Sequence, residues 1–140
     1  KTLAVAESCT GGLLASRITE VPGASAFFRG ATIAYHPRVK KKLGVSPETI
    51  RKYGEVSPQV AGELARCVRE RMESDFGIGI TGIAGPGGGS AKKPVGLVYI
   101  GLASPDKKVR IRKHGFWGER HQVQERAAVK ALEYLWRTIR

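Results

Sequence analysis

The sequence predicts an α/β protein, a three-layer α/β/α sandwich built around a mixed, mainly parallel sheet. Short apolar runs, which favour buried strands, alternate with amphipathic helical patterns along the chain. Near the C-terminus two strand-like runs follow each other across a tight turn, which adds antiparallel pairing to the sheet. With 41% apolar and 26% charged residues, we expect residues 1–140 to form one globular domain.

The N-terminal part reads as strand, tight turn, helix and strand. Residues 2–6 form a short apolar run typical of a buried strand, and a polar stretch with two glycines follows. A helix is expected over residues 12–20, ending before Pro22-Gly23. A second strand is expected near residues 31–35, ending at His36-Pro37.

The middle of the chain contains two helix starts and a third strand. Ser46 and Ser57 each precede a proline, the pattern of an N-cap residue followed by proline at the first helical position. Apolar residues then recur with helical spacing after Ser57, which predicts an amphipathic helix. Residues 77–80 favour a buried strand, and residues 81–90 favour a long glycine-rich loop at its end.

The C-terminal part predicts a hairpin and a long helix. Residues 95–103 and 108–116 are strand-like runs, and the turn signals at 104–107 favour antiparallel pairing between them. Apolar residues repeat every four positions over 120–139, where we expect a helix with Trp136 packed in or beside the core. The order of elements is therefore strand, helix, strand, helix, helix, strand, hairpin, helix.

Composition restricts partners and location. The net charge of +12 attracts phosphates, nucleic acids and acidic membranes alike, so it does not choose among them. Cys9 and Cys67 lack metal-ligand spacing, and we expect free thiols and no zinc. No run approaches the ~18 apolar residues of a membrane span. The apolar start before Glu7 is also too short for a signal peptide, so we expect a cytoplasmic protein without membrane contact.

Two glycine-rich segments follow predicted strands, at residues 7–12 and 81–90. Ligands of open α/β sheets bind at the carboxyl ends of the strands, which predicts a pocket between these segments. Glycine-rich backbone at a helix start can hold a phosphate. Neither segment matches a nucleoside-triphosphate or dinucleotide fingerprint, so those ligands are disfavoured. A purely structural tight turn stays an equal alternative for the glycines.

Six motifs stand out along the chain, at residues 6–12, 22–28, 35–40, 54–57, 81–86 and 93–96. In their order and spacing, over nearly the whole chain, these motifs resemble the CinA C-terminal domain, the pyridine-nucleotide deamidase family also called PncC. A helix that the family has before Lys1 is missing and the chain opens directly on a strand, so we expect a domain trimmed at its N-terminus or detached from a longer protein.

The resemblance implies hydrolysis of nicotinamide mononucleotide to nicotinate mononucleotide and ammonia, a step of pyridine-nucleotide salvage, without metal or cofactor. It implies that Ser8 is the nucleophile, Lys40 the base and Tyr35 a residue that orients or relays the proton. Cys9 is the alternative nucleophile. Ser8 and Thr10 are also both candidates for capping the following helix.

The same resemblance implies the residues that bind the substrate, a pyridine mononucleotide. They are Glu7, Thr10, Gly11, Gly12, Ser25, Thr81, Gly82, Ala84, Gly85 and Arg120. Arg120 is the expected phosphate ligand. A second arginine of the family is replaced here by Gln124, for which Arg126 or His121 would compensate.

The main alternative is a basic nucleotide- or nucleic-acid-binding module, linked to competence or DNA damage, without catalysis. Nucleic acid is the less favoured partner, because the chain has no zinc finger, RNA-recognition signature or helix-turn-helix pattern. A catalytically silent nucleotide sensor is a third reading. The oligomeric state stays open, with a homo-oligomer among the options.

Overall fold

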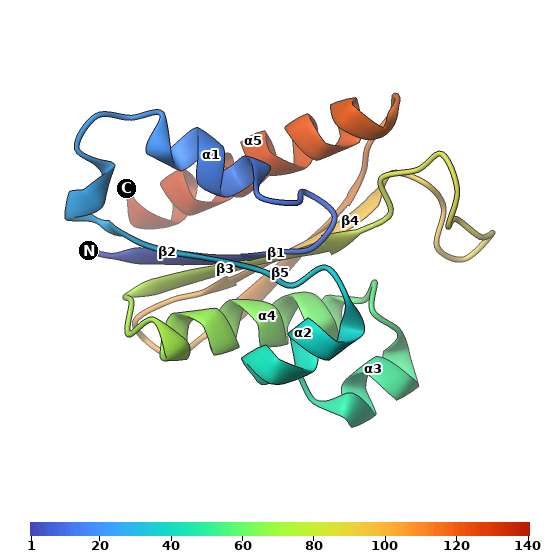
Figure 1. Cartoon of the computed structure of the whole chain (residues 1–140), viewed down its shortest axis with the longest axis horizontal. Helices are drawn as coiled ribbons and strands as arrows, with labels where there is room; N and C mark the ends of the chain where they lie inside the picture. Colours follow the sequence, from blue (N-terminus) through green and yellow to red (C-terminus); the bar gives the residue numbers. More distant parts are fainter.

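The computed structural model describes residues 1–140 as a five-stranded sheet between two layers of helices (Figure 1). The strands lie in the order β2-β1-β3-β4-β5. Their bounds are β1 Leu3–Glu7, β2 Phe28–Ile33, β3 Phe76–Gly82, β4 Leu97–Ala103 and β5 Val109–Gly115.

The pairing of the strands gives the sheet one dominant direction. β1 pairs in parallel with both β2 and β3, while β4 pairs antiparallel with β3 and with β5. Four strands therefore point the same way and β4 alone runs against them, which is the mixed, mainly parallel sheet that the sequence predicts. The carboxyl ends of β1, β2, β3 and β5 all lie at one edge of the sheet, which is called the carboxyl edge below.

Helices cover both faces of the sheet, so the three-layer prediction is confirmed (Figure 1). One layer contains α1 and α5, and the other contains α4 with α2 and α3 beside it. A short 3-10 helix, η1, precedes β2. None of these helices is both long and apolar enough to cross a membrane. Their bounds are α1 Leu13–Thr19, η1 Ala24–Ala26, α2 Pro37–Leu43, α3 Pro47–Tyr53, α4 Pro58–Arg71 and α5 Arg120–Ile139.

Side chains of β1 alternate between the two hydrophobic cores. Leu3 and Val5 belong to the larger core, between the sheet and helices α1 and α5. Ala4 and Ala6 belong to the smaller core, under α4. The small alanines leave room for α4 to pack close to the sheet, and the whole strand is buried as a central parallel strand should be.

Glycines in β3 and β4 bring α4 into contact with the sheet backbone. A Cβ atom built on Gly79 lies 2.4 Å from the carbonyl oxygen of Ala61, and one built on Gly101 lies 2.4 Å from the same oxygen. Neither distance is sterically allowed, so both positions need a residue without a side chain. The glycines inside these strands therefore mark a close approach of helix and sheet.

Helix α2 is absent from the sequence-based prediction, which has the chain leaving a strand at His36-Pro37. His36 caps α2 instead, because its Nδ1 accepts a hydrogen bond from the amide of Arg38 at 3.2 Å. Pro37 takes the first helical position. The helix ends at Gly44, whose φ of 128° is a conformation that favours glycine.

Several smaller predictions were also wrong, whereas the prediction for the last helix was correct. Thr81 and Gly82 belong to β3 rather than to the loop. β2 begins at Phe28 and ends at Ile33, earlier than the predicted residues 31–35. Trp136 is exposed, with the guanidinium of Arg140 over its ring, and does not pack in the core. Helix α5 has the predicted bounds of 120–139.

Candidate functional site

A pocket lies at the carboxyl edge of the sheet, where four segments that are distant in sequence meet. They are the turn after β1, the segment after β2, the glycine-rich loop after β3 and the start of α5. The pocket has a volume of about 200 Å³ and adjoins a second hollow of about 600 Å³ that shares Ala84 and Arg120 with it. It is lined by Ser8, Cys9, Tyr35, Gly82, Ile83, Ala84, Gly85, Gly87, Gly88 and Arg120.

Ser8 is positioned by the end of β1 and by the turn that follows. Its amide donates to the carbonyl oxygen of Ile80 on β3 at 3.0 Å, which continues the parallel pairing one residue beyond β1. Gly11 and Gly12 then turn the chain into α1 with φ values of 59° and 107°. These two glycines shape the turn and are not among the residues that line the pocket.

Glu7 has a structural role that the sequence analysis missed. Its side chain is fully buried, and its two carboxylate oxygens accept hydrogen bonds at 2.9 Å from the amides of Leu14 and Ala15. Glu7 thus satisfies free N–H groups in the first turn of α1. Both oxygens are thus used inside the protein, and the expected substrate contact of Glu7 stays a prediction.

Thr10 is not the helix cap either. Gly12 occupies the N-cap position of α1 without any side-chain hydrogen bond. The hydroxyl of Thr10 is buried without a hydrogen-bond partner, and Thr10 does not line the pocket. The substrate-binding role expected for Thr10 therefore stays a prediction.

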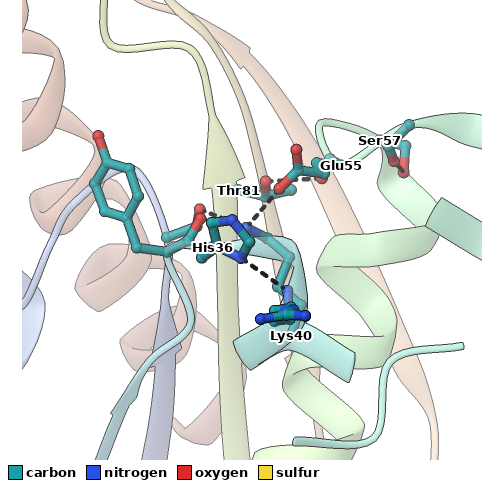
Figure 2. Close-up of polar contacts among 9 residues, drawn as sticks. His36, Lys40, Glu55, Ser57 and Thr81 are labelled. Atoms are coloured by element: carbon teal, nitrogen blue, oxygen red, sulfur yellow. Dashed lines mark hydrogen bonds and ion pairs between the residues drawn. The ribbon is translucent and has the colours of Figure 1, made fainter. Parts of the chain in front are cut away.

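Lys40 reaches Ser8 from α2 and lies behind the residues that line the pocket. Its side chain is only 1% exposed, whereas Lys41 and Lys42 are exposed to solvent. The Nζ atom lies 3.0 Å from Oγ of Ser8. It also lies 3.0 Å from the carbonyl oxygen of Tyr35 and 3.2 Å from Oε1 of Glu55 (Figure 2). The structure therefore brings together the serine and the lysine that the family resemblance singles out.

The partners of Lys40 determine what its amine can do. The carbonyl oxygen of Tyr35 and the carboxylate of Glu55 can only accept hydrogen bonds. Each of them therefore accepts one N–H of the Lys40 amine. An ammonium group has a third N–H, which it donates to Ser8. A neutral amine has instead a lone pair at that position, facing the Ser8 hydroxyl. The geometry thus allows proton transfer between Ser8 and Lys40 in both directions.

Tyr35 contacts two functional residues through different groups. Its carbonyl oxygen accepts from Lys40, and its phenol oxygen accepts a hydrogen bond of 2.7 Å from Nη2 of Arg120. The phenol makes no hydrogen bond to Ser8 or Lys40. Tyr35 therefore orients the lysine through its main chain, and the expected proton relay through its side chain is not the arrangement in this structure.

Arg120 places a positive charge at the rim of the pocket. Its Nη1 donates to the carbonyl oxygen of Gly85 at 2.8 Å, and its Nη2 donates to Tyr35. Both partners are uncharged, and no carboxylate lies within ion-pair distance of the guanidinium. An anionic group entering the pocket would find this charge without a competing counterion.

Gln124, which takes the place of a family arginine, ties α5 to the serine turn. Its Nε2 donates to the carbonyl oxygen of Cys9 at 2.9 Å. Arg126 lies outside the pocket, and His121 lines only the adjoining hollow. Gln124 thus holds the turn that presents Ser8, one turn of helix after Arg120.

Cys9 is a poor nucleophile in this environment. Burial raises the pKa of its thiol to about 12. The thiolate is the reactive form of cysteine, so very little of it exists near neutral pH. Although Cys9 lines the pocket, the nucleophile at this site is better supplied by Ser8.

Thr81 and Glu55 form a contact that the sequence analysis did not foresee. Thr81 is buried, and its hydroxyl donates to the main-chain oxygen of Glu55 at 2.9 Å (Figure 2). Thr81 thus fixes the segment that carries Glu55, and its expected role in substrate binding stays a prediction. Glu55 belongs to the motif at residues 54–57, but its side-chain contact with Lys40 depends on helix α2, which was not predicted.

Ser25 lies far from the pocket. It is exposed on η1, which precedes β2 and therefore lies at the edge of the sheet opposite the carboxyl edge (Figure 1). Helix α1 carries the chain back across the sheet before this point. Ser25 is not among the residues that line the pocket, and its expected substrate contact stays a prediction. No three His, Cys, Asp or Glu side chains lie close enough together to hold a metal ion.

The fold and the site define an α/β/α protein with a buried serine–lysine pair at the carboxyl edge of its sheet. The sequence matches the CinA C-terminal domain family over residues 1–139. The chain belongs to this family.

Its relatives agree with that membership. The chain is 51% identical over 140 residues to a protein of Halothermothrix orenii whose name describes it as competence-damage inducible, and the match covers 99% of this chain and 34% of that protein. It is 49% identical over 139 residues to a CinA-like protein of Acidobacterium capsulatum, covering 99% of this chain and 33% of that one. The chain thus spans about a third of the length of these relatives.

Solved structures share the fold over almost the full chain. The competence/damage inducible protein CihA of Agrobacterium tumefaciens superposes with a TM-score of 0.93 at 38% identity, covering 96% of this chain and 82% of that one. A CinA superfamily protein of Escherichia coli superposes with a TM-score of 0.93 at 32% identity, covering 99% and 80%. These neighbours support the mixed-sheet α/β fold described above.

Proposed function

We propose that the chain hydrolyses the carboxamide of nicotinamide mononucleotide, giving nicotinate mononucleotide and ammonia. The observation that carries the proposal is the 3.0 Å contact between Oγ of Ser8, which lines the pocket, and the buried Nζ of Lys40. A hydroxyl held against a base is the arrangement that makes serine a nucleophile toward an unreactive amide.

The reaction follows from the groups present. Ser8 transfers its proton to Lys40 while its oxygen forms a bond to the carboxamide carbon. Lys40 then gives this proton to the departing nitrogen, which leaves as ammonia as the carbon–nitrogen bond breaks. Water attacks the resulting ester, losing a proton to Lys40, and Lys40 returns a proton to Ser8 as nicotinate mononucleotide is released.

The developing negative charge on the amide oxygen needs hydrogen-bond donors. Ala84 and Gly85 line the pocket, and their main-chain N–H groups donate to no protein acceptor. They are the candidate donors. Glycine at position 85 has a φ of 85°, a left-handed conformation that side chains disfavour, and a Cβ atom there would lie 2.5 Å from Val95.

The charge of Arg120 supports a phosphate-bearing substrate. The guanidinium lies where the pocket meets the larger hollow, so a ligand can place its amide beside Ser8 and its phosphate beside Arg120. Arginine recognises phosphate with paired hydrogen bonds. A mononucleotide has both groups, whereas free nicotinamide lacks the anion.

The proposal is tested by measuring ammonia release from nicotinamide mononucleotide beside nicotinamide and its riboside. Turnover is expected with the mononucleotide and much less with the two uncharged substrates. The Ser8→Ala variant serves as the control for contaminating amidase. Equal ammonia release by wild type and Ser8→Ala, or none by either, would reject the proposed activity.

A second candidate is a basic nucleotide- or nucleic-acid-binding module without catalysis, which the net charge of +12 favours. Its exposed cations include Lys107 and Lys108 in the turn between β4 and β5. This turn lies at the edge of the sheet opposite the pocket. The two functions thus depend on different cations, and that difference separates them experimentally.

A further inference from the structure

We infer that Glu55 is the positioning residue of the serine–lysine pair, orienting the amine of Lys40 and balancing its charge when it is protonated. The inference rests on the proposed hydrolysis. Oε1 of Glu55 lies 3.2 Å from Nζ of Lys40, and it is the only carboxylate within ion-pair distance of that amine. The Lys40 side chain is 1% exposed and that of Glu55 is 41% exposed.

The segment around Glu55 is fixed from several sides. Thr81 of β3 donates to the main-chain oxygen of Glu55 at 2.9 Å. Ser57 donates to the carbonyl oxygen of Gly54 at 2.9 Å and also caps α4. Tyr53 precedes Gly54, and its carbonyl oxygen accepts a hydrogen bond of 2.6 Å from Nζ of Lys93. Glu55 is therefore carried by a rigid turn, although its side chain reaches solvent.

The contacts of Lys40 include a single charged group. Ser8 and the Tyr35 carbonyl are uncharged, and Glu55 is the one charged group that contacts Lys40. Lys93 is a further cation beside this turn, because its Nζ would lie 2.7 Å from a Cβ atom on Gly54. The carboxylate of Glu55 is thus the counterion of Lys40.

The reaction gives this counterion two opposite effects. When Ser8 loses its proton, Lys40 becomes a buried ammonium, and a carboxylate at hydrogen-bond distance stabilises that charge. The acid of a serine–histidine–aspartate triad stabilises its protonated base in the same way. In the resting protein, however, the same carboxylate favours the ammonium form, which cannot accept the serine proton.

These opposite effects make Glu55→Gln diagnostic. The amide keeps the shape and an accepting oxygen but loses the charge. In a pH–rate profile we expect the acid limb to move to lower pH, because removal of an opposite charge favours the neutral amine. The plateau value of kcat should meanwhile fall by about 10²-fold, with KM nearly unchanged. Glu48→Gln, an exposed carboxylate on α3, is the matched control and should change neither.

Three results would overturn the inference. An unchanged profile and an unchanged kcat would show that Glu55 is only a surface residue. A lower kcat with the acid limb unmoved, or a rise of KM alone, would show a structural or substrate-binding role. Equal melting temperatures of Glu55→Gln and wild type exclude loss of fold as the cause.

A second readout does not depend on the deamidase proposal. A fluorophosphonate probe reacts with an activated serine: the Ser8 oxygen bonds to phosphorus, fluoride leaves, and Lys40 takes the proton. The rate of labelling should show the same shift of its acid limb in Glu55→Gln, and Ser8→Ala should not label. Labelling that depends on Glu55, without ammonia release from nicotinamide mononucleotide, would reject the deamidase and keep the inference. A wild-type protein that neither labels nor releases ammonia would overturn both.

Discussion

The Nζ atom of Lys40 and the Oγ atom of Ser8 lie 3.0 Å apart in a buried contact, although 32 positions separate the two residues in sequence. If this contact activates the serine, Ser8→Ala and Lys40→Met should each lower kcat by about 10³-fold or more. Methionine has a length similar to lysine and avoids leaving a cavity. The measurement is steady-state ammonia release, with circular dichroism to verify folding.

Cys9→Ala is the matched control, because its side chain lines the same pocket. It should retain most of the wild-type kcat. If Cys9→Ala abolished turnover and Ser8→Ala left it near the wild-type value, the nucleophile would be the thiol and the assignment of Ser8 would be wrong.

The buried thiol also predicts a pH dependence of stability. Burial raises the pKa of Cys9 from 9.0 to about 12. Between these values the unfolded chain loses the thiol proton that the native protein keeps, so the native state binds more protons and its stability falls as pH rises. Below pH 9 the effect is absent. Chemical denaturation between pH 8 and 11 should therefore show a steeper loss of stability in wild type than in Cys9→Ala, and parallel curves would contradict the burial of the thiol.

Lys40 shows how much of the site could be predicted from the sequence. The family resemblance singled out this lysine, but the residues alone favoured a solvated Lys-Lys-Lys run. The inward face of α2 decides between the readings, because Lys40 and Leu43 lie one turn apart and are both buried. The helix was missed because His36 is an uncommon N-cap, although proline at the next position was a usable signal.

Glu7 and Thr81 show a different limit. Both stand in motifs of the family, and both were expected to touch the substrate. Neither residue lines the pocket. Glu7 accepts hydrogen bonds from amides of α1, and Thr81 donates to the main chain of Glu55. A motif shows that a residue type is needed at a position, but only the three-dimensional contacts show whether the side chain faces the ligand or holds the residue that does.

The alternation and order of elements were predictable because they depend on local patterns. The position of α4 also explains why β3 contains glycines where a strand-forming residue would be expected. Gly79→Ala should destabilise the protein by roughly 1–3 kcal/mol, because the new methyl group meets the backbone of α4 and neither element can move freely. Gly115→Ala on β5 is the control, since a Cβ atom there has no neighbour within 4 Å. Urea denaturation of both variants measures the difference, and equal stabilities would show that α4 does not pack this closely.

The positive charge of the chain separates the two candidate functions. For a deamidase, one cation at the pocket should matter greatly, and Arg120→Ala should weaken binding of nicotinamide mononucleotide by roughly 1.5–3 kcal/mol, the value of a charge-assisted hydrogen bond. Lys107→Gln with Lys108→Gln should leave binding and turnover nearly intact, because these exposed lysines lie at the opposite edge of the sheet.

A nucleic-acid-binding module would behave in the reverse way. Its affinity would fall steeply with salt, and loss of two phosphate contacts would reduce the slope of log K against log salt by about 1.8. A salt series of DNA and RNA binding, run beside calorimetric titration of the mononucleotide on the same variants, decides the matter. Submicromolar nucleic-acid binding that loses this slope in the double lysine variant, with no mononucleotide binding to wild type, would reject the deamidase reading.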